Sequence, residues 1–94
     1  MTNELREIIN YIRYVYPNTD MIRLNQVLFY SDYLSLESTG IPITWSKYHI
    51  INKIPYCATI LADWANPIKF DKPITVVPSV QYHVSSTINQ VIKE

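Results

Sequence analysis

The first stretch of the chain repeats apolar residues at helical spacing. Thr2 or Asn3 can cap a helix whose first turn carries Glu4 and Glu7, where negative charge suits the helix dipole. Pro17 then ends the pattern and begins a polar turn. The apolar positions lie on one stripe and predict one amphipathic helix that ends before Pro17: Leu5, Ile8, Ile9, Ile12, Val15 and Tyr16.

A second and longer helix is predicted over residues 20–38, capped by Thr19 or Asp20. Its apolar residues surround most of the circumference, which is typical of a central helix contacted from several sides. Gly40, the only glycine, follows its end, where a left-handed capping conformation is easiest for glycine. These apolar positions are Leu24, Val27, Leu28, Phe29, Tyr30, Tyr33, Leu34 and Leu36.

The second half of the chain has shorter and less regular patterns. Residues 48–51, YHII, fit a strand or a short helical turn equally well. Pro55 at a first helical position predicts a third helix over residues 55–65, with Cys57 on its apolar face. Residues 67–78 have β-branched residues around an FDKP turn and predict a short hairpin at a sheet edge. Ser79 is the expected cap of the last helix.

These elements predict a mainly α protein, a compact bundle of about four helices with a short β-hairpin before the last helix. Ninety-four residues fit one domain, 1–94, without an internal repeat or interior linker. The formal net charge is zero, so no overall field attracts the chain to phosphate backbones or to a membrane. No apolar run is long enough to cross a bilayer, and we expect a cytoplasmic protein.

Residue types needed for catalysis are scarce and scattered. One glycine excludes the usual glycine-rich phosphate loops. His49, His83 and Cys57 have no recognisable metal-ligand spacing, and Cys57 has no second cysteine to pair with. We therefore expect no enzymatic activity, no metal and no cofactor.

The strongest functional signal is a group of aromatic residues beside cations. Trp45, Tyr48 and Tyr56 fall in or near the irregular central segment, next to Lys47 and Lys53. Aromatic residues bordered by cations are common at interface hot spots, so these five residues are the candidate partner-binding site. An equally weighted alternative is that Trp45 fills the gap between the second and third helices.

Two functions follow from this reading. The favoured one is a small module that binds another protein, with a homodimer also expected from the amount of Tyr and Ile on so short a chain. The other is a small nucleic-acid-binding transcriptional regulator in which Lys47, Lys53, Lys69 and Lys72 converge on phosphate.

Residues 24–48, LNQVLFYSDYLSLESTGIPITWSKY, resemble the opening of the Panacea domain. That family has a helix similar to K-L-L-Y-F-A-D, then a glycine, then P-[IL]-T and a later aromatic residue. The residues that match the helix motif here are Val27, Leu28, Phe29, Tyr30 and Asp32. The remaining motif residues are Gly40, Pro42, Ile43, Thr44 and Tyr48. Where members usually carry Gly-Pro-Val, this chain has Lys53, Ile54 and Pro55. Its tail from residue 74 is similar in outline to a short segment followed by the late helix of the family.

The resemblance implies a predominantly helical module without catalytic residues. Members found in antitoxins neutralise a partner toxin, and others act as adaptors or regulators. It therefore suggests a binder that inhibits or neutralises a partner protein, in an antitoxin-like role or as a phage-encoded inhibitor of a host or defence protein.

Overall fold

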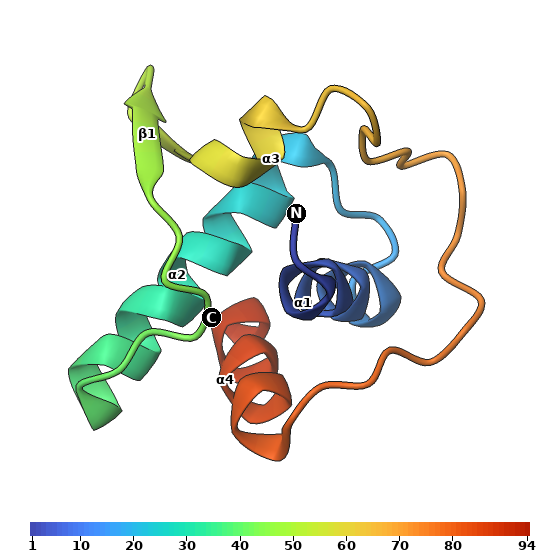
Figure 1. The fold of residues 1–94 in the computed structure, drawn as a ribbon. Coiled ribbons are helices and arrows are strands. Elements are labelled where there is room, and N and C mark those ends of the chain that lie inside the picture. Colours follow the sequence, from blue (N-terminus) through green and yellow to red (C-terminus); the bar gives the residue numbers. More distant parts are fainter.

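The computed structural model describes residues 1–94 and contains four helices and one two-stranded antiparallel sheet. The mainly α class is therefore confirmed, and a hairpin precedes the last helix (Figure 1), at residues 48–57 and not at the predicted residues 67–78. The elements in chain order are α1 (Asn3–Val15), α2 (Met21–Thr39), β1 (Tyr48–Ile51), β2 (Ile54–Cys57), α3 (Ala58–Ala62) and α4 (Tyr82–Lys93).

The two long helices begin and end where local sequence chemistry predicts. The Thr2 hydroxyl accepts the Leu5 N–H at the start of α1, and the Asp20 carboxylate accepts the Arg23 N–H at the start of α2. Gly40 closes α2 in the left-handed conformation, with φ of 80°.

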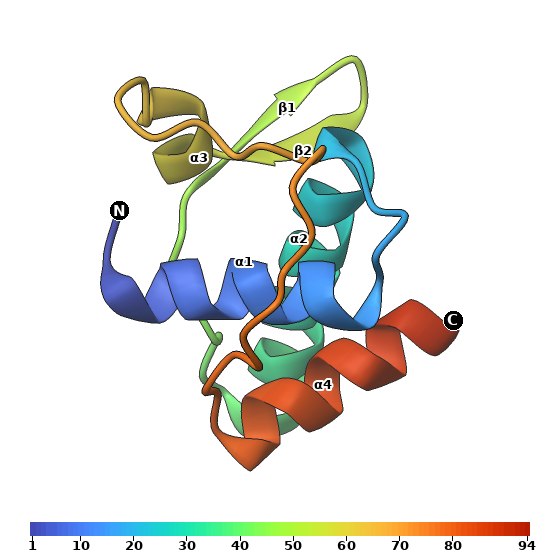
Figure 2. The same cartoon turned by 90° about the vertical axis from the view of Figure 1, so that its right-hand side faces the viewer.

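Helix α2 is the central element of the fold. It contacts α1, α4 and β2, so its buried residues face three neighbours. Figure 1 looks along α1 while α2 crosses the view, whereas in Figure 2 both α1 and α4 run across the view. A bundle of aligned helices is therefore not confirmed, because α2 crosses α1. The core combines residues of α1 and α2 with a few from β2, α3 and α4: Leu5, Ile8, Ile9, Ile12, Leu24, Val27, Leu28, Cys57, Ile60 and Ile88.

The sheet occupies part of the segment predicted to be the third helix. Residues 54–57 form β2, and only the five residues Ala58–Ala62 are helical. Pro55 pairs with Ile50 in the hairpin. A proline can occupy an edge strand where its missing N–H would face away from the partner strand, so its presence did not require a helix start here. Of the two structures considered for YHII, the strand is correct.

The hairpin predicted over residues 67–78 does not form. This segment has no regular structure and crosses α1 on its way to α4 (Figure 2). Three prolines, Pro67, Pro73 and Pro78, remove N–H donors that a ladder would need. Side chains of α1 hold the segment instead. Ser79 donates its N–H to the Glu7 carboxylate and does not cap α4, which begins three residues later.

No helix in this fold has the length and apolar content that crossing a membrane requires.

Candidate functional site

A buried carboxylate in the middle of α2 fastens the loop that follows the helix. Asp32 is 7% exposed. Its Oδ1 accepts the backbone N–H groups of Ile43 at 2.8 Å and Thr44 at 2.7 Å, and its Oδ2 accepts the hydroxyls of Thr44 and Tyr48. A buried carboxylate is tolerated when it is fully hydrogen-bonded, and its bonds are stronger than those between neutral groups. The loop therefore has one fixed position on the helix.

A second buried polar residue on the same helix holds the other end of the hairpin. Asn25 is fully buried; its Nδ2 donates to the Met21 carbonyl at 2.8 Å, and its Oδ1 accepts the Cys57 N–H at 2.7 Å. Asn25 and Asp32 are seven residues apart, about two helical turns, so they share a face of α2. The two side chains together fix both ends of the segment 43–57.

Tyr48 belongs to this anchor and faces inward. Its ring packs edge-on against Phe29, with ring centres 5.1 Å apart, and its hydroxyl donates to Asp32. Burial raises the pKa of the Tyr48 phenol well above its ordinary value, and the hydrogen bond to Asp32 and the charge of that carboxylate raise it further. Tyr48 therefore stays protonated and holds the loop, and little of it is available to a partner.

Trp45 lies in the loop that Asp32 holds after α2, and its side chain faces solvent. Its side chain is 73% exposed, so it does not fill the gap between helices. Its backbone has φ of 57°, a left-handed conformation that is uncommon for a bulky residue and costs free energy. The neighbouring Thr44 is bound to Asp32, and its hydroxyl accepts the Ser46 N–H at 3.2 Å. The surroundings thus hold a large aromatic side chain in an exposed position.

The hairpin that follows Trp45 has one face turned away from the protein. Successive strand residues point to opposite faces, and Pro55 and Cys57 are buried against the protein, so the alternate residues face outward. The carbonyl of Lys47 accepts the Ala58 N–H, which extends the ladder by one pair. The outward residues are therefore Lys47, His49 and Ile51 on one strand, with Ile54 and Tyr56 beside them.

Lys53 lies at the tip of the hairpin. Asn52 and Lys53 both have positive φ, 50° and 67°, as a two-residue turn of type I′ requires. Of the five candidate residues, Lys47 and Tyr56 thus face outward from the hairpin, Lys53 lies at its tip, and Trp45 is exposed on the loop before it. We call these four residues, together with His49 and Ile51, the hairpin surface. Strand alternation starting from Lys47 would have added His49 and Ile51, although Ile50 on the other face is exposed as well.

The four lysines expected to converge on phosphate form two separate pairs. Lys47 and Lys53 lie at the hairpin, and Lys69 and Lys72 lie on the segment beside α1, on the opposite side of the view in Figure 1. The prediction that these four lysines converge on one phosphate-binding surface is therefore wrong.

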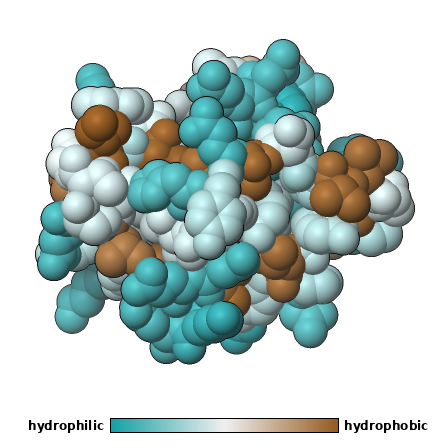
Figure 3. Space-filling model, turned by 90° about the horizontal axis from the view of Figure 1, so that it is seen from below, coloured by the Kyte–Doolittle hydropathy of each residue, from teal (hydrophilic) through white to brown (hydrophobic).

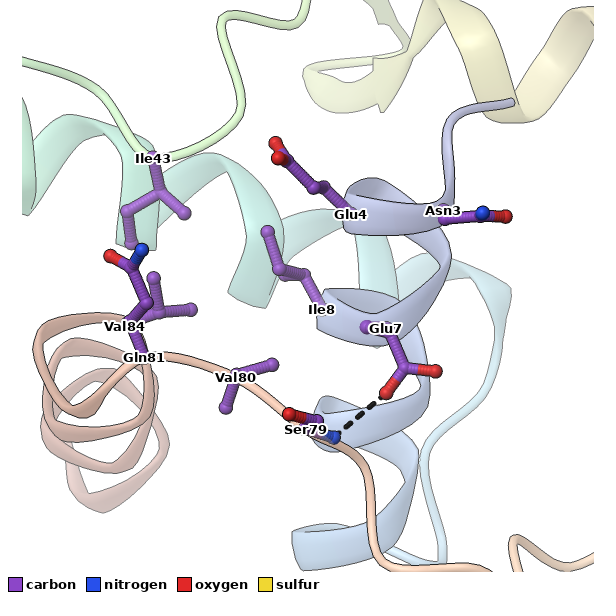
Figure 4. Close-up of a pocket in the computed structure, with 9 residues that line it drawn as sticks. All are labelled: Asn3, Glu4, Glu7, Ile8, Ile43, Ser79, Val80, Gln81 and Val84. Atoms are coloured by element: carbon purple, nitrogen blue, oxygen red, sulfur yellow. Dashed lines mark hydrogen bonds between the residues drawn. The ribbon is translucent and has the colours of Figure 1, made fainter.

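A cavity of about 390 Å³ separates α1 from the start of α4. Figure 4 shows Ile8 and Val80 in its apolar part and the carboxylates of Glu4 and Glu7 on the α1 side. The bond from the Ser79 N–H to Glu7, drawn dashed, is 2.8 Å long. The cavity is acidic, and one of its two carboxylates already serves to hold the chain before α4.

Metal-ligating and nucleophilic side chains are dispersed. No three His, Cys, Asp or Glu residues lie close enough to hold a metal ion. The His83 ring lies 2.9 Å from the Ser35 hydroxyl, which links α4 to α2. Cys57 is fully buried at the end of β2 rather than on a helix, so its thiol packs as a small apolar group.

The surface seen from below carries apolar side chains in several separate groups divided by polar ones (Figure 3). Isolated exposed apolar residues are normal on a small protein. On this face, no continuous apolar patch identifies a partner-binding site.

No family model, curated protein or solved structure matches the chain. The resemblance to the Panacea domain stays a prediction from the residues. The structure adds that Asp32, Ile43, Thr44 and Tyr48, which carry much of that resemblance, are the residues joined by the buried carboxylate.

Proposed function

We propose that the protein is a binding module that inhibits or neutralises a partner protein through the hairpin surface. The observation that carries the proposal is Trp45, a large aromatic side chain held 73% exposed in a left-handed conformation beside a buried, four-fold hydrogen-bonded carboxylate. Backbone strain maintained by its surroundings is concentrated at functional sites. Exposed tryptophan is among the residues most enriched at interface hot spots.

The anchoring of the loop supports recognition without a large rearrangement. Association costs less when the contacting segment is already ordered, because less conformational freedom is lost on binding. Asn25 and Asp32 supply that order at both ends of the segment. The antitoxin-type resemblance supports the inhibitory outcome of binding.

Charge indicates the kind of partner. Residues 38–62 contain no Asp or Glu but carry Lys47 and Lys53. A partner with acidic side chains around an apolar pocket would complement this surface, with the pocket accepting Trp45.

The test compares two tryptophans that differ in how they are held. Trp64 is 89% exposed and follows α3, without the buried carboxylate that flanks Trp45. Tagged wild type, Trp45→Ala and Trp64→Ala are expressed in cells that naturally carry the chain, and captured proteins are quantified by mass spectrometry. The Kd of each variant for the captured partner is then measured with purified proteins.

We expect Trp45→Ala to weaken the partner's affinity by about thirtyfold or more, and Trp64→Ala to change it less than about threefold. Both variants should keep the helical circular dichroism of the wild type. Equal binding by Trp45→Ala and wild type, or an equal loss in both variants, would refute the proposed site. Tyr48→Ala is unsuitable for this test because it disrupts the anchor itself.

A further inference from the structure

Helix α1 carries opposite charges on different faces. Glu4 and Glu7 line the cavity beside the start of α4. Arg6 and Arg13 are seven residues apart, about two turns, and share another face. The irregular segment that includes residues 67–74 lies against this second face.

Arg13 fixes the conformation of that segment. Its Nη2 donates to the carbonyl of Lys69 at 2.7 Å and to that of Lys72 at 2.6 Å. The guanidinium carbon also lies 5.3 Å from the centre of the Phe70 ring. Because the carbonyls of Lys69 and Lys72 accept from the same nitrogen, the backbone of both lysines is held beside α1. The ammonium groups of the two lysines make no hydrogen bond within the protein.

The result is a cleft of about 260 Å³ between α1 and this segment. It is lined by Arg6, Arg13, Lys69 and Lys72, with apolar residues between them, and no carboxylate lines it. The nearby Asp71 interacts with Arg13 but lines the adjacent cavity. Half of the chain's eight Lys and Arg residues therefore line one cleft of a protein with no net charge.

Three of these cations have no partner within the protein. The side chains of Arg6, Lys69 and Lys72 form no hydrogen bond to a protein acceptor, and Arg13 uses only one of its nitrogens. Like charges held together repel, so an anion placed among them would remove an unfavourable interaction as well as accept hydrogen bonds.

The geometry points to a binding site for a phosphate-class anion in this cleft. Guanidinium and ammonium groups are the side chains that proteins use for phosphate oxygens. The volume is below that of most small-molecule pockets, so it suits a phosphate or diphosphate group rather than a whole large ligand. This site is independent of the hairpin surface, which lies on the other side of the molecule (Figure 1).

The chain offers a matched pair of variants for the test. Lys69→Gln/Lys72→Gln removes two exposed lysines from the cleft, while their carbonyls can still accept from Arg13. Lys47→Gln/Lys53→Gln removes two exposed lysines from the hairpin and changes the net charge equally. The full chain is titrated with sodium pyrophosphate at low salt, and binding is followed by amide NMR shifts and calorimetry. A second arm uses a single-stranded oligonucleotide, with pyrophosphate as competitor.

We expect saturable pyrophosphate binding that shifts amides of residues 67–74 and of α1. The Lys69→Gln/Lys72→Gln protein should bind about tenfold more weakly, and the hairpin pair should change affinity less than twofold. Displacement of a bound oligonucleotide by pyrophosphate would support the same site. Absence of saturable binding, equal weakening by both pairs, or oligonucleotide binding that pyrophosphate does not displace would overturn the assignment.

Discussion

Replacing Asp32 by asparagine tests whether the buried carboxylate fastens the loop after α2. In the wild type it accepts four hydrogen bonds. A bond to a charged group contributes about 1.5–3 kcal/mol and one between neutral groups about 0.5–1.5 kcal/mol. Asparagine has one accepting oxygen, which suits the two backbone N–H groups, whereas its NH2 group can only donate, so the hydroxyls of Thr44 and Tyr48 must turn and accept from it. Each of the four bonds then joins neutral groups and loses about 1 kcal/mol, and we expect Asp32→Asn to lower the free energy of unfolding by at least about 4 kcal/mol.

The control is the same chemical change elsewhere on the helix. Asp20 is exposed and caps α2, and asparagine caps as well as aspartate, so Asp20→Asn should cost less than about 0.5 kcal/mol. Tyr48→Phe removes one of the four bonds and should cost about 1.5–3 kcal/mol. For a domain of this length, that corresponds to a fall in Tm of about 6–24 °C.

Urea unfolding followed by circular dichroism gives these free energies. The double variant Asp32→Asn/Tyr48→Phe should lose less than the sum of the single variants, because the two residues share a bond. If Asp32→Asn were no more destabilising than Asp20→Asn, or if the two single effects simply added, the buried carboxylate would not be what fastens the loop.

Two further predictions concern the hairpin and its anchor. Lys53→Gly should raise the free energy of unfolding by about 1 kcal/mol, because Lys53 occupies a left-handed position that glycine adopts without strain. Asn52→Gly should raise it less, since asparagine tolerates this conformation. Equal increases in the two variants would contradict this explanation. The raised pKa of Tyr48 means that its contribution to stability is fully present below the unfolded pKa of about 10 and is lost as pH rises above that value. Urea unfolding from about pH 9 to 11 should therefore show a smaller decline for Tyr48→Phe than for wild type, and parallel declines would count against a buried phenol.

The long helices could be predicted because their limits depend on neighbouring residues. The Asp20 cap acts three residues away and Gly40 acts on the turn that precedes it. The same local reasoning failed at Pro55, because proline suits both the first turn of a helix and an edge strand. The strand that forms is held by a bond that local sequence does not reveal, from the Cys57 N–H to Asn25, thirty-two residues earlier.

The sequence could locate the candidate site, but it could not show which of its side chains face solvent and which face the core. The aromatic residues near the centre of the chain do lie around one structural unit. The sequence left the exposure of Trp45 open, and it gave no indication that Tyr48 turns inward to Asp32. The orientation of Tyr48 depends on Asp32, which the sequence marked only as the last residue of the helix motif that resembles the Panacea domain.

In this structure, Asn25 and Asp32 hold the segment 43–57 in one position before any partner binds. Amide hydrogen exchange tests it directly, because the N–H groups of Ile43 and Thr44 bind only Asp32 and that of Cys57 binds only Asn25. We expect all three amides to be protected from exchange in the wild type. Asp32→Asn should remove much of the protection at residues 43 and 44, and less of the protection at residue 57. Exchange of the Ile43 and Thr44 amides at the rate of an unprotected loop in the wild type would contradict the account.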